Sequence, residues 1–136
     1  MRFFDTNILV YAATEQDIRK RDIARELIRH AIEVNHDGYI STQVLQEFCN
    51  AMYKRTSRTK EQIDSMIDYF RELLATDVTI DLVRRAMVVK EEYKIQFYDA
   101  LIVATALKLG CHEIVSEDFS EDQLYCGMAI VNPFKE

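Results

Sequence analysis

The fold is decided by the stretch Tyr98-Asp99-Ala100-Leu101-Ile102-Val103-Ala104-Thr105-Ala106-Leu107-Lys108-Leu109. When this segment is wound as a helix, apolar side chains cover almost its whole circumference, and such a helix is normally central and buried. Gly110 follows as the expected C-terminal stop. The sequence therefore predicts a central, buried helix over residues 98–109.

Short strands and helices alternate along the rest of the chain. We predict strands at 2–5, 39–40, 78–80, 113–116 and 128–131, and helices at 8–13, 17–34, 42–52, 59–74 and 82–93. The helix over 59–74 opens with a capping box made by Thr59 and Gln62. Alternation of this kind is typical of a parallel sheet with helices on both faces. We therefore predict an α/β fold of three α/β/α layers, with a short, mostly parallel central sheet and a single domain over residues 1–136.

The overall charge argues against simple electrostatic binding of nucleic acid. The chain has 136 residues and a formal net charge of −6 at pH 7. An acidic protein has no global attraction for phosphate, because Lys and Arg are the residues that neutralise it. A site that holds divalent cations can nevertheless bind phosphate through them. Basic residues cluster at Lys54, Arg55, Arg58 and Lys60, and a solvated helix face is the simplest interpretation of that cluster.

The sequence carries no mark of an oxidising compartment or of a membrane. Its three cysteines are an odd number and give no disulfide framework. The opening apolar run is broken by Asp5 and Asn7, unlike that of a secretory signal peptide. No uninterrupted apolar stretch is long enough to cross a bilayer. We therefore expect a cytoplasmic protein that does not enter a membrane.

Four acidic residues occupy positions from which they can meet. Asp5 ends the first predicted strand and Asp118 follows the strand over 113–116, so both lie at carboxyl ends of strands, where α/β sheets bind ligands. Glu47 borders the apolar stripe of its helix, and Asp99 opens the most apolar helix. Each of them alone has an ordinary explanation as a cap, a helix-dipole residue, a half-exposed residue or a turn residue. Crowded together, four carboxylates repel strongly and need protons or cations between them.

A cluster of carboxylate oxygens favours hard ions such as Mg²⁺ or Mn²⁺ over zinc. One such ion can lower the pKa of bound water and deliver hydroxide to a phosphodiester, and a second can stabilise the leaving oxygen. No side-chain nucleophile is then required, and the sequence has no GxSxG, Walker A or GxGxxG motif. The adjacent pair Cys111-His112 lacks the further ligands that a zinc site needs.

Four segments resemble the motifs of the PIN-domain family. They are Asp5-Thr6-Asn7, Gln46-Glu47-Phe48, Tyr98 to Ala106, and Ser116-Glu117-Asp118-Phe119. The closing Val131-Asn132-Pro133-Phe134 is similar to the end of a bacterial subgroup of the family. The motifs follow the family's order and span the whole chain. Many members are VapC-type toxins of type II toxin–antitoxin modules.

The resemblance implies a Rossmann-like α/β/α fold and an endoribonuclease activity that depends on Mg²⁺ or Mn²⁺. It also implies a homodimer, as in many members. Toxin members are inhibited by a small antitoxin protein that wraps the helices and approaches the acidic pocket. On this basis we expect a hydrolase that cleaves RNA phosphodiester bonds, with a cognate antitoxin as its protein partner.

Carried over residue by residue, the resemblance implies that the catalytic metal ligands are Asp5, Glu47, Asp99 and Asp118. The last position has alternatives, because Glu117 is adjacent to Asp118 and Asp122 lies four residues on. Thr6 and Asn7 are expected to orient Asp5, and Ser116 to help position water or phosphate.

Two other functions compete with a ribonuclease. The first is a PIN-like domain that has lost catalysis and serves as a binding scaffold, against which the intact acidic set argues. The second is a phosphate-handling α/β domain. Phosphatases of the haloacid dehalogenase type need a second Asp two places after the first, where this chain has Asn7. Receiver domains need an Asp pair near the first strand and a Lys near the last, and neither pattern is present in this order.

Overall fold

A five-stranded parallel sheet forms the centre of the molecule in a computed structural model, which describes residues 1–135. The strands are β1 (Arg2–Phe4), β2 (Gly38–Ser41), β3 (Leu74–Thr76), β4 (Glu113–Val115) and β5 (Ala129–Val131). They lie side by side in the order β3-β2-β1-β4-β5, and each neighbouring pair is parallel. The predicted parallel α/β sheet is confirmed.

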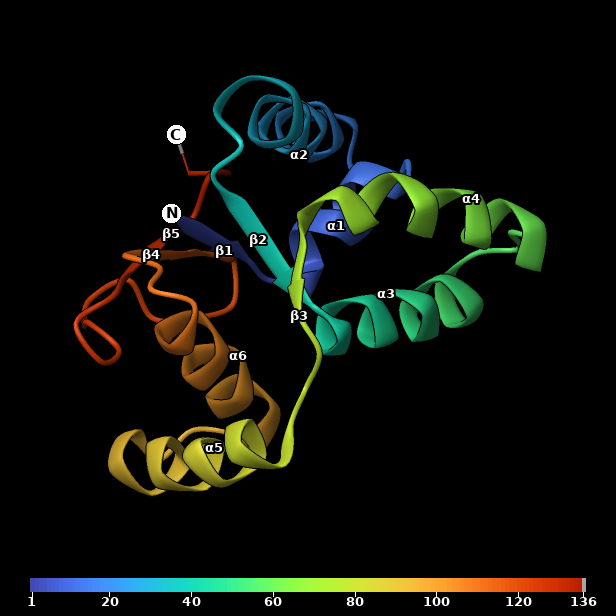
Figure 1. Cartoon of the computed structure of the whole chain (residues 1–136). Helices are drawn as coiled ribbons and strands as arrows, with labels where there is room; N and C mark the ends of the chain where they lie inside the picture. Colours follow the sequence, from blue (N-terminus) through green and yellow to red (C-terminus); the bar gives the residue numbers. More distant parts are fainter. Residues whose placement is uncertain (136) are drawn as a thin grey trace.

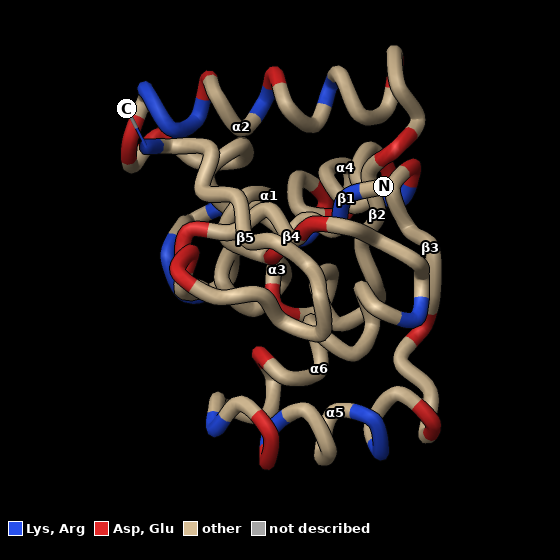
Figure 2. The backbone as a smooth tube through the Cα atoms, turned by 90° about the vertical axis from the view of Figure 1, so that its left-hand side faces the viewer, with Lys and Arg blue, Asp and Glu red and all other residues tan. Residues whose placement is uncertain are grey.

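Helices cover both faces of this sheet. They are α1 (Thr6–Ala13), α2 (Ile18–His30), α3 (Thr42–Arg55), α4 (Lys60–Phe70), α5 (Ile80–Tyr93) and α6 (Phe97–Lys108). A π-helical turn, Ala31–Asn35, continues α2, and a 3-10 turn, Arg71–Leu73, follows α4. Figure 1 shows α1 and α2 on one face of the sheet and α5 and α6 on the other. From the side, in Figure 2, α2 and α5 are the outermost layers. The predicted three-layer arrangement is therefore confirmed.

The predicted central helix is α6. Its residues 100–106 are all buried, as its almost continuous apolar sequence requires. Gly110 follows the helix with φ +77°, a left-handed conformation that glycine adopts without steric cost. Within residues 1–135 no helix combines the length and the apolar character needed to span a membrane.

The strand predicted at 78–80 is wrong. The extended segment lies earlier, at Leu74–Thr76, and Ile80 is instead the first residue of α5. Thr79 caps that helix, because its side chain accepts a hydrogen bond from the backbone N–H of Leu82. The helix predicted over 59–74 accordingly ends at Phe70. Its capping box, made by Thr59 and Gln62, is confirmed.

The strand order places a ligand-binding crevice beside β1. From β1 the chain passes to β2 on one side, and β4 later joins β1 on the other side. The carboxyl ends of β1 and β4 therefore border the point where the strand order reverses, which is where open α/β sheets bind ligands. Asp5 directly follows β1, and Ser116 directly follows β4.

We expect Gly38→Ala to destabilise the protein, because β2 packs here without room for a side chain. An added Cβ would lie 2.5 Å from Cε2 of Phe4 and 2.8 Å from Cβ of Ala31, and both neighbours are buried. Overpacking of this kind costs about 1–3 kcal/mol of unfolding free energy. Thermal unfolding should show a Tm lower by roughly 4–10 °C. An unchanged Tm would mean that Phe4 can move aside freely.

Candidate metal centre

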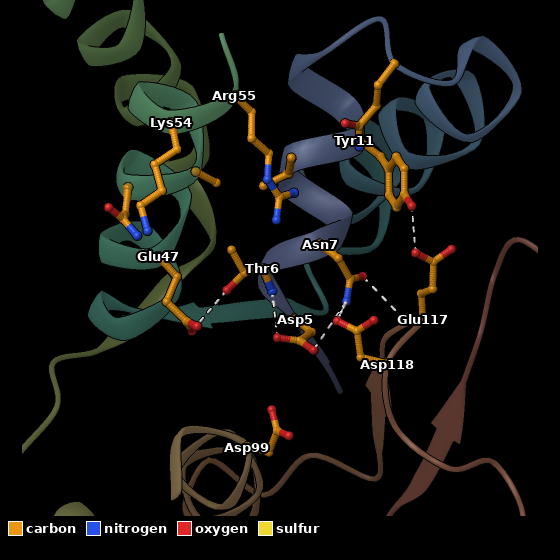
Figure 3. Close-up of a pocket in the computed structure, with 14 residues that line it drawn as sticks. Asp5, Thr6, Asn7, Tyr11, Glu47, Lys54, Arg55, Asp99, Glu117 and Asp118 are labelled. Atoms are coloured by element: carbon orange, nitrogen blue, oxygen red, sulfur yellow. Dashed lines mark hydrogen bonds between the residues drawn. The ribbon is translucent and has the colours of Figure 1, made fainter. Parts of the chain in front are cut away.

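Carboxylates from four separate parts of the chain line one cavity of about 480 Å³. The four that sequence assigns to metal binding are Asp5, Glu47, Asp99 and Asp118, and Glu117 lines the cavity beside Asp118. Figure 3 shows Asp5 at the end of β1, Glu47 on α3, Asp99 at the start of α6 and Asp118 after β4. The cavity therefore lies at the carboxyl edge of the sheet, in the crevice that the strand order creates.

Asp5 is the most buried of the four, with 7% of its surface exposed. The backbone N–H of Thr6 donates to its Oδ1 (2.8 Å), and the Ser116 hydroxyl donates to its Oδ2 (2.7 Å). Burial raises the pKa of Asp5 to about 7, although these hydrogen bonds oppose the rise, and the charges of Glu47 and Asp118 add to it. The hydrogen bonds from Thr6 and Ser116 thus do not fully offset the cost of burying ionised Asp5.

Glu47 is held by two donors. The Thr6 hydroxyl lies 3.2 Å from its Oε1, and Nε2 of Gln43 lies 3.1 Å from the same oxygen. The Gln43 amide also donates to the carbonyl of Tyr98 (3.0 Å), which precedes Asp99. Burial, and to a lesser degree the charge of Asp99, keeps the pKa of Glu47 above its usual range. Sequence reasoning missed Gln43, whose one signal was its spacing of four residues before Glu47 on the same helix.

Asp118 is tied to Asp5 through Asn7 and Ser116. Nδ2 of Asn7 donates to Oδ2 of Asp118 (2.9 Å) and lies 3.4 Å from Oδ2 of Asp5. Oγ of Ser116 accepts from the backbone N–H of Asp118 (3.1 Å) while its hydroxyl donates to Asp5. Asn7 and Ser116 therefore link Asp5 to Asp118 through hydrogen bonds, and Thr6 links Asp5 to Glu47.

Asp99 faces this group from the opposite wall of the cavity (Figure 3). Burial, followed by repulsion from Asp118, raises the pKa of Asp99. Within residues 1–135 the Asp99 carboxylate has no hydrogen-bond or ion-pair partner. A carboxylate in this position is free to bind an external cation.

The three candidates for the last acid, Asp118, Glu117 and Asp122, differ in their surroundings. Glu117 lines the cavity but accepts a hydrogen bond from the Tyr11 hydroxyl (2.6 Å) and forms an ion pair with Lys20. Burial alone would raise the pKa of Glu117, but Lys20 and Tyr11 outweigh burial and hold it below its usual range. Asp122 is not among the residues that line the cavity. Of the three candidates, Asp118 is the one whose charge raises the pKa of both Asp5 and Asp99. Sequence reasoning missed Lys20 and Tyr11, which lie about a hundred residues from their partner.

The donor set fits a hard divalent cation. Every donor is a carboxylate oxygen, the charges repel, and the cations on the cavity wall, Lys54 and Arg55, pair with none of the acids within residues 1–135. In that part of the chain, however, no three acidic, His or Cys side chains lie close enough together to enclose an ion. The four carboxylates therefore form an open arrangement around the cavity. Mg²⁺ suits such an arrangement, because it usually keeps several of its waters.

A family model described as the PIN domain matches residues 2–123. The chain belongs to the PIN-domain family. The matched range includes every candidate site residue of this PIN domain, from Asp5 to Asp122. No curated protein matches the chain significantly.

Solved structures similar to this PIN domain include three from bacteria. A toxin–antitoxin complex from Klebsiella pneumoniae is 20% identical, with a TM-score of 0.71 and full coverage (100%) of both chains. VapC20 from Mycobacterium tuberculosis, a toxin that cleaves the sarcin–ricin loop, is 20% identical with a TM-score of 0.67, covering 95% of this chain and 99% of that one. VapBC2 from Rickettsia felis, bound to a promoter DNA fragment, is 22% identical with a TM-score of 0.64, covering 95% and 96%. At this level of identity the likeness shows a common fold.

Proposed function

We propose that this PIN domain is an endoribonuclease that hydrolyses RNA phosphodiester bonds with Mg²⁺ or Mn²⁺. One observation carries the proposal: the carboxylates of Asp5, Glu47, Asp99 and Asp118 face one cavity, and within residues 1–135 none of them forms an ion pair with a Lys or Arg. Such a site is stable when divalent ions neutralise it. We further propose that residues 1–136 act as one domain in the cytoplasm, where the free thiols of the chain stay reduced.

Each side chain has a distinct part in the proposed reaction. The four carboxylates hold the ions, which supply a water of lowered pKa and neutralise charge on the phosphate. Thr6 and Gln43 orient Glu47, and Ser116 and Asn7 orient Asp5 and Asp118. Glu117 keeps the turn after β4 in place through Lys20 and Tyr11. The open side of the cavity leaves room for a phosphodiester.

We expect Gln43→Met to weaken metal binding without abolishing catalysis. The thioether side chain has a similar length but cannot donate to Glu47 or to the Tyr98 carbonyl, so Glu47 loses its orientation relative to Asp99. Loss of a residue that orients a metal ligand typically costs 10–100-fold in metal affinity or activity. The Mg²⁺ concentration for half-maximal cleavage should rise about tenfold, and activity should recover at saturating Mg²⁺. An unchanged Mg²⁺ requirement would show that Gln43 does not position Glu47.

The direct test of the proposed function is cleavage of RNA by purified protein. Cleavage should require Mg²⁺ or Mn²⁺ and stop in chelator, and the Asp99→Asn variant serves as the inactive control. If the wild-type protein bound RNA or another macromolecule without cleaving it in either metal, the chain would instead be a PIN-like scaffold. Metal-dependent hydrolysis of a phosphomonoester with no effect on RNA would favour a phosphatase.

We also propose that a cognate antitoxin occupies a groove of about 690 Å³ between α1, α2 and α4. Its floor is apolar and includes Ala13, Ile28, Met66 and Phe70. Its rim carries Arg25, Arg29 and Arg58, of which Arg29 pairs with Glu33 and Arg58 with Glu15. The apolar floor is therefore the feature that fits the apolar face of an amphipathic helix. Solved structures with the same fold include toxin–antitoxin complexes, which supports a partner of this kind.

The antitoxin proposal can be tested with the products of adjacent genes. A small neighbouring protein should inhibit RNA cleavage, and Met66→Asp, in the groove floor, should weaken inhibition at least tenfold without changing uninhibited cleavage. Inhibition unaffected by Met66→Asp would place the partner elsewhere, and no inhibition by any adjacent product would overturn the proposal.

A homodimer through α5 is the third part of the proposal. Ile80, Met87 and Val88 on α5 are 74%, 57% and 68% exposed, on the side opposite the buried residues of that helix. The basic pair Arg84–Arg85 precedes the acidic pair Glu91–Glu92, so an antiparallel two-fold pairing of α5 with a second copy joins opposite charges. Light scattering should give the mass of a dimer for the wild type and of a monomer for Met87→Asp. A monomeric wild type at micromolar concentration would contradict this part.

A further inference from the structure

Two cations of α3 line the same cavity as the four carboxylates. Lys54 and Arg55 lie in the last turn of α3, and both border the cavity together with Asn50 and Ala51. Figure 3 shows both side chains extending from α3 into the upper part of the cavity, whereas the carboxylates lie below. The cavity is therefore acidic at one end and basic at the other.

These cations are not used inside the protein. Within residues 1–135 neither Lys54 nor Arg55 has a carboxylate within ion-pair distance. The nearby Arg58, by contrast, pairs with Glu15 (3.2 Å). A molecule with a net charge of −6 thus leaves two positive side chains unneutralised at the wall of its acidic cavity. Both residues are exposed, as expected for a solvated helix face, and they also border the cavity.

The spacing along α3 suits a polyanion that extends from the acids. Lys54 and Arg55 follow Glu47 by seven and eight residues, which is about 10–12 Å along a helix axis. A stacked nucleic-acid strand rises about 3.4 Å per nucleotide, so this distance spans about three nucleotides, and fewer in an extended strand. Phosphates two to three positions from one held at the carboxylates would reach these cations.

We propose that Lys54 and Arg55 form a phosphate subsite that binds the substrate strand two to three nucleotides to one side of the scissile phosphate. This inference rests on the proposed ribonuclease function and adds how the substrate is positioned. The subsite supplies the attraction for phosphate that the acidic protein as a whole lacks. It also determines on which side the strand leaves the carboxylates, because Lys54 and Arg55 lie on one wall of the cavity and the acidic Asp99 lies on the opposite wall.

The first arm of the test measures cleavage of single-stranded RNA. The double variant Lys54→Ala/Arg55→Ala should raise KM about tenfold and leave kcat within about twofold, because the catalytic carboxylates are unchanged. The charge-preserving variant Lys54→Arg/Arg55→Lys should stay within about twofold of the wild-type KM. The control Arg71→Ala/Lys90→Ala removes the same charge from exposed positions outside the cavity and should leave KM unchanged.

The second arm measures binding apart from turnover. A fluorescein-labelled 12-nucleotide single-stranded RNA is titrated at several salt concentrations with Ca²⁺ in place of Mg²⁺, and gels verify that it stays intact. Each phosphate contact on a single strand contributes about 0.7 to the slope of log K against log salt, so the alanine pair should reduce the slope by about 1.4. The Arg71/Lys90 control should keep the wild-type slope.

The two arms separate failure of the subsite from failure of the function. If the wild-type protein cleaves RNA and the Lys54/Arg55 variant matches it in KM and salt slope, the subsite is refuted and the ribonuclease function stands. If the wild-type protein does not cleave RNA, the proposed function fails, and the salt slope alone decides whether the pair binds phosphate. If the Arg71/Lys90 control showed the same rise in KM and the same decrease in salt slope, the effect would come from net charge alone, and the subsite would be overturned.

Discussion

Asp99→Asn should reduce the rate of RNA cleavage on the order of 10³-fold. The change replaces one carboxylate oxygen with an NH2 group and so keeps the shape of the side chain. It removes the negative charge that faces Asp118 and Glu47 across the cavity. Removing a single group that stabilises charge in a transition state costs about 10²–10³ in kcat, and a metal ligand is expected at the upper end of that range. Single-turnover cleavage at saturating Mg²⁺ measures the effect.

The fold should survive this substitution, because Asp99 accepts no hydrogen bond within the described chain that the amide would lose. Circular dichroism and thermal unfolding establish this for each preparation. Asp68→Asn is the matched control, since Asp68 is exposed on α4 and does not line the cavity. It should cleave RNA like the wild type. Cleavage by Asp99→Asn at the wild-type rate, in protein free of contaminating nuclease, would refute the assignment of the site.

The architecture was readable from sequence because local patterns determine it. The apolar circumference of α6 and the capping box of Thr59 and Gln62 each specify an element without help from distant residues. The wrong prediction of a strand at 78–80 also comes from a local pattern. Val78 and Ile80 suggest a strand by their branched side chains, whereas the Thr79 cap and the packing of α5 place Ile80 in a helix. The true strand β3 is an exposed edge, so its sequence has no apolar alternation to reveal it.

The acids of the candidate site, and their motif neighbours Thr6, Asn7 and Ser116, could be predicted from sequence. Their motifs come in the order of the PIN-domain family, so sequence predicts that Asp5 and Asp99 belong together. The supporting residues that sequence reasoning missed make contacts between distant segments, such as Tyr11 with Glu117 and Gln43 with the Tyr98 carbonyl. No periodicity or spacing encodes such contacts. Lys54 and Arg55 show the same limit, because a basic helix end has one sequence whether it faces solvent or a cavity.

Asp5→Asn should make the protein more stable in the absence of metal. Asp5 has a pKa of about 7 in the folded protein and an ordinary value of 3.8 when unfolded, so the folded state binds its proton more tightly. Ionised Asp5 therefore destabilises the fold: the penalty is absent below pH 3.8, grows as the pH rises towards 7, and is fully present above it. Its upper bound is about 4 kcal/mol, and the hydrogen bonds from Thr6 and Ser116 will be kept in part by the amide.

Thermal unfolding in chelator at pH 8 should therefore give a Tm for Asp5→Asn roughly 5–10 °C above that of the wild type. At pH 4 the two curves should nearly coincide, because Asp5 is then protonated in the folded wild-type protein. Saturating Mg²⁺ should stabilise the wild type more than the variant, since binding to the folded state alone adds free energy by mass action. A variant that is less stable than the wild type at pH 8 in chelator would show that the charge of ionised Asp5 does not destabilise the fold. The carboxylates would then have no physical need for a cation, whatever their place in the fold.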